Sequence, residues 1–160
     1  MTARLMSQLI HKNIVSMESV EQMLSGVGGK LRLLVVDDTV LCRKFHIRMV
    51  REHCSDVVEA CNGQEAVDAV QCAMSSFDAI FMDSSMPFMN GTTATRLIRD
   101  MGYTGMVFGI TGNALQADVS DFIAHGADEV LVKPLSVDKY AYLIQVIRDK
   151  LAGRTLANKQ

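Results

Sequence analysis

The chain has 160 residues, of which 49% are hydrophobic and 21% are charged, and its formal net charge is −2. This length predicts one domain plus an appendage, and the composition is that of a soluble globular protein. A DNA-binding module usually carries a basic excess, so the slight acidity argues against nucleic acid as a partner. No apolar stretch approaches the roughly 20 residues of a membrane helix. No signal-peptide pattern is present either, and we expect a cytoplasmic protein.

Hydrophobic periodicity predicts an N-terminal helical arm and then five strand–helix pairs. Apolar residues recur at helical steps over residues 1–24 and glycines then break the pattern, so we assign residues 1–29 to an arm and its joint. The main domain is placed at residues 30–152, and a polar tail at 153–160. The predicted strands are residues 31–36, 57–60, 79–82, 106–110 and 129–132. The predicted helices are residues 39–54, 63–74, 92–101, 114–125 and 136–151.

This alternation predicts a doubly wound α/β fold, a five-stranded parallel sheet with helices on both faces. Polar residues follow four of the strands, namely Asp37-Asp38, Asp83, Thr111 and Lys133. In an open parallel sheet the carboxyl ends of the strands lie at one edge, where such folds bind ligands. We therefore expect these side chains to form one site.

The residue types at this edge indicate a divalent cation and a phosphoryl group. Clustered carboxylates repel one another unless a cation lies between them, and Mg²⁺ prefers oxygen ligands. Asp37-Asp38 alone could instead be a solvated turn that caps the next helix, but Asp83 and Lys133 favour the metal site. Asp83 is the candidate nucleophile, because a carboxylate can accept a phosphoryl group as an acyl phosphate. The Thr111 hydroxyl and the Lys133 ammonium suit phosphoryl oxygens.

From residue 31 to about residue 151, the chain resembles a response-regulator receiver domain. The matching segments are Val35-Val36-Asp37-Asp38, Phe81-Met82-Asp83, Met86-Pro87, Ile110-Thr111, Gly126-Ala127-Asp128 and Lys133-Pro134-Leu135. The resemblance is greatest to receivers of hybrid histidine kinases and to stand-alone phosphorelay receivers. It implies a flavodoxin-like fold with strand order 2-1-3-4-5.

The resemblance also implies a function, that of a phosphoacceptor module in a two-component phosphorelay. A histidine kinase or a histidine phosphotransfer protein would donate a phosphoryl group to Asp83. Mg²⁺ would be held by Asp38 and Asp83, by the backbone carbonyl of Ser85, and through water by Asp37. Such a module is not an enzyme beyond its own phosphoryl transfer and dephosphorylation, and we expect a monomer or a weak homodimer.

Phosphorylation would switch a protein-interaction surface through Thr111 and Lys133, which would bind the phosphoryl oxygens. In many receivers an aromatic residue lies three positions before the lysine, whereas this chain has Val130 there. The route by which the switch spreads is therefore left open. The Lys133-Pro134 bond is a candidate cis peptide, since such bonds occur in tight functional turns.

Two other classes share part of this pattern. A haloacid-dehalogenase-type phosphatase also uses an aspartate nucleophile, a lysine and Mg²⁺. That class has a second aspartate two residues after the nucleophile, where this chain has Ser85. A flavodoxin-like cofactor binder would need a phosphate-binding loop rich in Ser, Thr or Gly after the first strand, where Asp37-Asp38 stand instead.

Two further groups of residues have an open interpretation. The predicted helix 39–54 could present a solvated face or a docking surface for an acidic or four-helix-bundle partner. Its charged and polar residues are Arg43, Lys44, His46, Arg48 and Arg51. No cysteine belongs to a C-x-x-C pair, so we expect reduced, buried thiols. These cysteines are Cys42, Cys54, Cys61 and Cys72.

Overall fold

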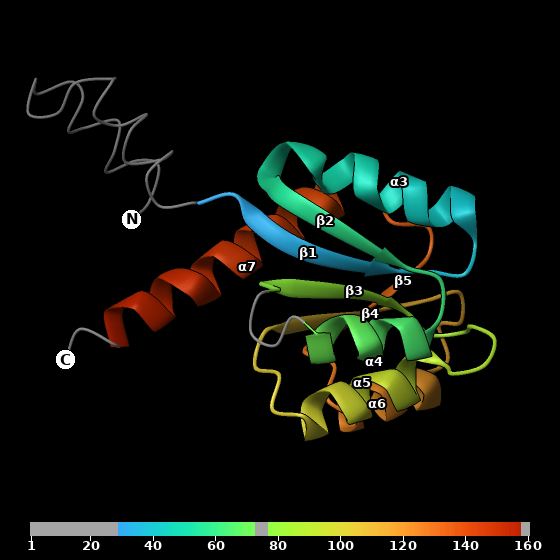
Figure 1. Ribbon diagram of the computed structural model, residues 1–160. Coiled ribbons are helices and arrows are strands. Elements are labelled where there is room, and N and C mark those ends of the chain that lie inside the picture. The colour runs from blue at the N-terminus through green and yellow to red at the C-terminus, as the bar shows by residue number, and fades with distance from the viewer. Residues whose placement is uncertain (1–28, 73–76, 158–160) are drawn as a thin grey trace, which may run out of the picture.

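The computed structural model of the protein describes residues 29–72 and 77–157, with side chains described up to residue 153. The arm predicted at residues 1–24 lies outside these residues. The strands form one five-stranded sheet in the order β2-β1-β3-β4-β5 (Figure 1). All neighbouring strands are parallel. The predicted doubly wound fold and its strand order are confirmed.

The strands carry the apolar runs that the sequence predicts. They are β1 (Leu31–Val36), β2 (Cys54–Ala60), β3 (Ala79–Asp83), β4 (Met106–Thr111) and β5 (Glu129–Val132). Every residue of β3 and β4 is buried, because helices cover both faces of these central strands. In the register of the sheet, Val36 lies beside Met82 and Thr111 beside Val132. The polar residues after β1 and β5 therefore lie near the end of β3.

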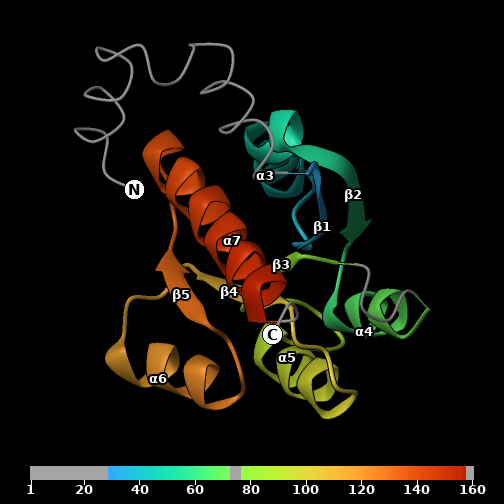
Figure 2. The same cartoon turned by 90° about the vertical axis from the view of Figure 1, so that its left-hand side faces the viewer.

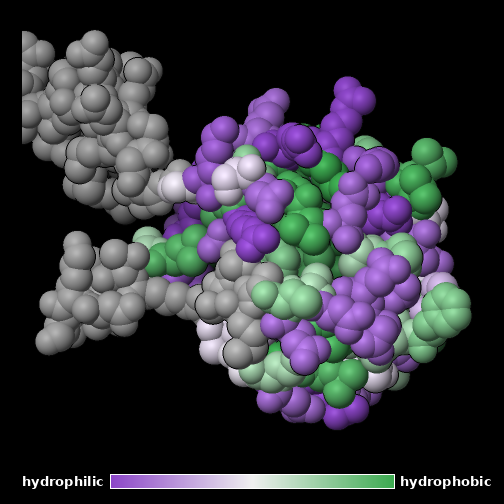
Figure 3. All heavy atoms as spheres, viewed as in Figure 1, coloured by the Kyte–Doolittle hydropathy of each residue, from purple (hydrophilic) through white to green (hydrophobic). Residues whose placement is uncertain are grey.

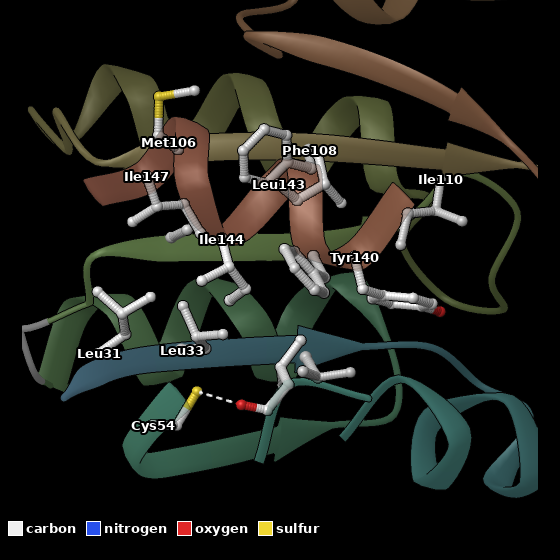
Figure 4. Packing of buried hydrophobic residues seen from close by; sticks show 14 of the residues in the cluster. Leu31, Leu33, Cys54, Met106, Phe108, Ile110, Tyr140, Leu143, Ile144 and Ile147 are labelled. Atoms are coloured by element: carbon white, nitrogen blue, oxygen red, sulfur yellow. Dashed lines mark hydrogen bonds between the residues drawn. The ribbon is translucent and has the colours of Figure 1, made fainter. Parts of the chain in front are cut away.

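The helices cover the sheet in two layers. They are α3 (Val40–Val50), α4 (Gly63–Cys72), α5 (Gly91–Asp100), α6 (Gln116–Ala124) and α7 (Val137–Ala157). Helices α3 and α7 lie on one face, and α4, α5 and α6 lie on the other (Figures 1 and 2). Two buried clusters result, one on each side of the sheet. Figure 4 shows the first, in which α7 residues such as Leu143 and Ile147 pack over the strands.

Several boundaries differ from the sequence prediction. Helix α3 ends at Val50, a short 3₁₀ turn follows, and β2 begins at Cys54 instead of residue 57. The pairing of Leu31 with Cys54 extends β2 to the start of β1, which a reading of β2 alone could not reveal. Helix α7 continues to Ala157, so helix occupies most of the segment assigned to a polar tail. No proline interrupts that segment, and loss of apolar periodicity alone does not end a helix.

The cysteines are free thiols, as predicted, but only one is buried. Cys54 lies in the core, where its thiol donates to the carbonyl of Val50 (3.2 Å; Figure 4). Cys42 and Cys61 are partly exposed and Cys72 is exposed. The prediction of four buried thiols is therefore wrong for three of them. Burial raises the pKa of the Cys54 thiol to about 11, which keeps it protonated.

Candidate functional site

Three carboxylates meet at the carboxyl edge of the sheet. Asp37 and Asp38 follow β1, and Asp83 is the last residue of β3. One oxygen of each lies within 4.8 Å of the others. Asp37 and Asp83 are buried, whereas Asp38 is exposed. The structure thus brings together the three carboxylates that the sequence singled out, with one side open to solvent.

Lys133 joins the two buried carboxylates. Its Nζ lies 2.8 Å from Oδ1 of Asp83 and 2.9 Å from Oδ2 of Asp37. Burial alone would lower the pKa of Lys133, but its hydrogen bonds to Asp83 and Asp37 outweigh this and raise it. The ammonium is therefore charged at neutral pH. The Lys133-Pro134 peptide bond is cis, as predicted.

Asp37 is held as an anion by several donors. Burial would raise its pKa, but His46, Lys133 and the backbone N–H of Thr39 together bring it below the ordinary value. The Thr39 N–H donates to Oδ1 at 2.8 Å, and Arg43 Nη1 donates to the backbone carbonyl of Asp37 at 2.6 Å. The carboxylate and its peptide carbonyl are both fixed from the α3 side.

Asp83 has a different environment. Burial raises its pKa, Lys133 opposes this, and the nearby charges of Asp37 and Asp38 add to the increase. Two backbone hydrogen bonds fix the chain just after it, from Ser84 N–H to Ile110 (2.8 Å) and from Gly91 N–H to Ser84 (3.0 Å). Lys133 contacts Oδ1 of Asp83, which leaves Oδ2 available to a ligand.

Thr111 and Ser85 are near Asp83 in the sheet and in the chain, since Asp83 pairs with Ile110, just before Thr111, and Ser85 follows Asp83 by two residues. Thr111, the last residue of β4, is buried, and its hydroxyl oxygen accepts the N–H of Asn113 at 3.0 Å. The hydroxyl proton remains available to an anion, because a hydroxyl both accepts and donates. The Thr111 carbonyl accepts the N–H of Lys133 at 2.7 Å, which ties the two residues together. Ser85 is exposed in the loop between β3 and α5.

Helix α3 is not uniformly a solvated face. Arg43 and Lys44 pair with Glu59 of β2, at 3.0 and 2.7 Å. His46 is only 5% exposed and turns inward, so its assignment to a surface face is wrong. Its position four residues before Val50, on the side of α3 that faces the sheet, is the signal that could have revealed this.

An apolar groove of about 290 Å³ adjoins the acidic cluster. Its walls come from α3, from the loop after β5 and from α7. The lining residues are Leu41, Cys42, Phe45, His46, Lys133, Pro134, Leu135 and Tyr140. Two of these lining residues on α3 are exposed, Leu41 (81%) and Phe45 (47%). In Figure 3, hydrophilic side chains cover much of the surface over α3, and hydrophobic ones reach the surface near its right-hand end.

The donor set suits a hard divalent cation. Carboxylate and carbonyl oxygens are the ligands that Mg²⁺ prefers, usually with several waters retained. Three carboxylates within reach of one ion, one of them exposed, leave room for such waters. A lysine beside the same carboxylates adds a donor for an anionic group. The arrangement can hold a metal ion and a phosphoryl group side by side.

The chain is similar in sequence to a known protein family and to several of its members. Residues 33–145 match the response regulator receiver domain family. The two-component response regulator ORR41 of Oryza sativa subsp. japonica is 38% identical over 120 residues, which are 74% of this chain and 94% of that protein. Two-component system protein A of Emericella nidulans is 35% identical over 114 residues, which are 71% of this chain but only 17% of that protein.

The solved structures show the same fold. The receiver domain of the sensor histidine kinase PA1611 from Pseudomonas aeruginosa PAO1 has a TM-score of 0.67 and 26% sequence identity. The match covers 76% of this chain and 99% of that chain, whose structure has a magnesium ion coordinated in the active site cleft. These matches give no support to the phosphatase alternative. Among residues 29–72 and 77–157, no helix combines the length and apolar character that a membrane span requires.

Proposed function

Because this chain belongs to the family of response regulator receiver domains, the phosphoacceptor modules of two-component signalling, we propose that Asp83 is its phosphoacceptor. The observation that carries the proposal is the position of Asp83. It is buried at the end of the central strand, with Lys133 on one carboxylate oxygen and two further carboxylates within reach of a shared cation. A cytoplasmic location and a monomeric or weakly dimeric state remain part of the proposal, and sedimentation of the full chain would test the latter.

The metal that the site would hold is Mg²⁺, with Asp38 and Asp83 as direct ligands, the backbone carbonyl of Ser85 as a third, and Asp37 acting through water. Bound there, the ion would neutralise the oxygens of the incoming phosphoryl group. The donor chemistry supports this, since all four groups offer oxygen. Both oxygens of the Asp37 carboxylate already have a donor, Thr39 N–H on Oδ1 and Lys133 on Oδ2, which suits a residue that binds the metal through water.

In the proposed transfer, a carboxylate oxygen of Asp83 attacks the phosphorus of a phosphohistidine on the partner. The P–N bond breaks, the electron pair returns to the imidazole, and a P–O bond forms to give an aspartyl phosphate. Lys133 would then move from the carboxylates toward a phosphoryl oxygen, and the Thr111 hydroxyl would donate to another. The Lys133 ammonium is charged and the Thr111 hydroxyl is a dipole before the reaction begins. Less reorganisation is therefore needed to stabilise the charge that develops on the phosphoryl oxygens.

Phosphorylation is proposed to act on the surface formed by α6 and β5, because Thr111 ends β4 shortly before α6 and Lys133 directly follows β5. Val130 of β5 is partly buried and packs against the cluster on the α4–α6 side. An aliphatic side chain cannot report the position of Thr111 by the rotation of a ring. The displacement of Lys133 and of the loop after it is therefore the more direct route for the switch.

The partner is proposed to be a histidine kinase or a histidine phosphotransfer protein that docks on α3 and the adjoining groove. Leu41 and Phe45 expose apolar surface next to the acidic cluster, and Arg48 of the same helix is exposed. Apolar anchors with a charged rim are typical of protein interfaces. A donor bound there would have its phosphohistidine close to Asp83.

Phosphorylation with acetyl phosphate and Mg²⁺ tests the acceptor. We expect the wild-type chain to gain one phosphoryl group by intact-mass spectrometry and the Asp83→Asn variant to gain none. Asp100→Asn is the matched control, because Asp100 is exposed on α5 and pairs only with Arg96 among its described ion pairs. Label that persists in Asp83→Asn would refute the assignment.

Calorimetric titration with Mg²⁺ tests the metal site separately. Removing a ligand carboxylate in Asp38→Ala should weaken binding by at least about tenfold, since each charged ligand contributes strongly to affinity for a hard cation. Asp100→Ala should bind as the wild type does. Equal affinity of Asp38→Ala and the wild type would contradict the ligand assignment.

A further inference from the structure

Two buried polar side chains lie behind the acidic cluster, one on α3 and one on α7. Nδ1 of His46 and the hydroxyl of Tyr140 are 2.6 Å apart. The other ring nitrogen of His46, Nε2, lies 3.7 Å from Oδ2 of Asp37. His46 is 5% exposed and Tyr140 is 2% exposed. The imidazole therefore stands between a tyrosine and the carboxylate, with a nitrogen toward each.

We propose that His46 and Tyr140 are positioning residues for Asp37, with the tyrosine hydroxyl selecting the imidazole tautomer that presents Nε2–H to the carboxylate. The inference deepens the proposed function, because it rests on the role of Asp37 in the metal site. Substitution of a group that orients a metal ligand commonly weakens metal binding, even though that group does not touch the metal.

The proposed direction of the hydrogen bond is consistent with the chemistry of the three groups. Burial raises the pKa of Tyr140, so the phenol keeps its proton and is available as a donor. In the proposed arrangement the hydroxyl donates to Nδ1 of His46 across the 2.6 Å contact, and the single imidazole proton then lies on Nε2. Nε2–H faces Asp37, which the surrounding donors keep ionised. At 3.7 Å this contact is longer than a hydrogen bond. The N–H dipole of the imidazole therefore acts on the carboxylate by electrostatic attraction.

Other donors bind the two carboxylate oxygens of Asp37. Thr39 N–H fixes Oδ1 and Lys133 fixes Oδ2. If Lys133 turns to a phosphoryl group, Oδ2 loses its close donor. His46 then remains as the donor that faces this oxygen from within the core. The His46–Tyr140 pair therefore contributes most to the orientation of Asp37 when a phosphoryl group occupies the site.

Packing alone does not explain the pair. Phe45, His46 and Tyr140 form edge and tilted ring contacts with one another. An apolar side chain in place of His46 could make such contacts and would bury no polar atom. Burial of a polar atom costs free energy unless the atom is paired. What the imidazole adds is a donor aimed at Asp37 and an acceptor matched to Tyr140.

The tautomer is directly measurable in the full chain. Long-range proton–nitrogen NMR correlations distinguish a protonated ring nitrogen from an unprotonated one, and the His46→Gln variant assigns the signals. We expect wild-type His46 with Nε2 protonated and Nδ1 unprotonated, and a mixed population in Tyr140→Phe. Nδ1 protonated in the wild type would overturn the proposal, as would a tautomer that is the same in Tyr140→Phe.

Magnesium affinity provides the second readout. Tyr140→Phe keeps the buried ring and removes one hydroxyl, so we expect about two- to tenfold weaker Mg²⁺ binding, the value of one hydrogen bond. The matched control is Tyr142→Phe on the same helix, whose hydroxyl instead contacts Glu129 at 3.3 Å. Equal affinities of Tyr140→Phe and Tyr142→Phe would contradict the proposal.

Substitution of His46 separates positioning from packing. His46→Leu fills the core but offers no donor, whereas the amide of His46→Gln can place an N–H near the position of Nε2. We expect weakened Mg²⁺ binding in His46→Leu and recovery toward wild type in His46→Gln. A glutamine variant no better than leucine would refute the donor role. Wild-type protein that binds no Mg²⁺ would instead overturn the proposed function, and this inference with it.

Discussion

Gly91, the first residue of α5, lies against the backbone of the proposed phosphoacceptor. A Cβ built at this position would lie 1.9 Å from the carbonyl oxygen of Asp83, whereas real Cβ atoms essentially never come closer than 3.0 Å. Gly91 also donates its N–H to Ser84 at 3.0 Å. The helix can approach the end of β3 this closely only because the residue has no side chain.

The Gly91→Ala variant would force α5 and the Asp83 carbonyl apart by about 1.1 Å. Overpacking of a buried contact costs about 1–3 kcal/mol, and loss of the hydrogen bond to Ser84 costs about 1 kcal/mol. Alanine recovers up to about 1 kcal/mol of helix propensity. The free energy of unfolding should therefore fall by about 1–3 kcal/mol, and the melting temperature by roughly 3–10 °C.

Thermal unfolding followed by circular dichroism measures the stability, and acetyl phosphate labelling measures the effect on Asp83. The control is Gly112→Ala, at the same edge of the sheet, where an added Cβ meets no atom within 4 Å. We expect Gly112→Ala to melt within about 2 °C of the wild type, since it creates no such overlap. If Gly91→Ala melts with Gly112→Ala and is labelled at the wild-type rate, the close approach is refuted.

Two further substitutions test the charges around the site and the support beneath it. Lys133→Met removes the cation between Asp37 and Asp83. Added Mg²⁺ should then raise the melting temperature more than it does in the wild type, while labelling by acetyl phosphate slows by about 100-fold; an equal Mg²⁺ shift in both proteins would contradict this reasoning. Arg99→Met removes donors from four acceptors in the loops before β4 and β5, so we expect a loss of about 2–4 kcal/mol in urea unfolding. Arg96→Met, on the exposed side of the same helix, should change stability by no more than about 0.5 kcal/mol, and equal losses in the two variants would refute the bracing role of Arg99.

The sequence predicted the composition of the site because the fold itself collects it. Once the strands are parallel, the residues after β1, β3, β4 and β5 must share one edge, whatever their separation along the chain. Asp37 and Lys133 are 96 residues apart yet in contact. Periodicity and strand-end chemistry were sufficient to find such pairs.

Contacts that depend on how elements pack against each other in the core were not predictable from the strand-end residues. His46 was grouped with the basic residues of a solvated or docking face, although its place on α3 turns it to the core. The contact with Tyr140 joins residues that are 94 positions apart and requires the packing of α7 on α3. The role of Gly91 likewise requires the distance between a helix and a strand, which no local pattern encodes.

The charge balance of the site connects these features. Three carboxylates and one lysine leave two negative charges, which a divalent cation balances. A phosphoryl group on Asp83 would replace one negative charge with about two, so the site is least repulsive to an anionic donor when the cation is already present. A second cationic side chain beside Asp37, in addition to Lys133, would weaken that requirement and compete with the metal. The tautomer proposed for His46 carries no net charge, so it would orient Asp37 without altering the charge that the cation has to balance.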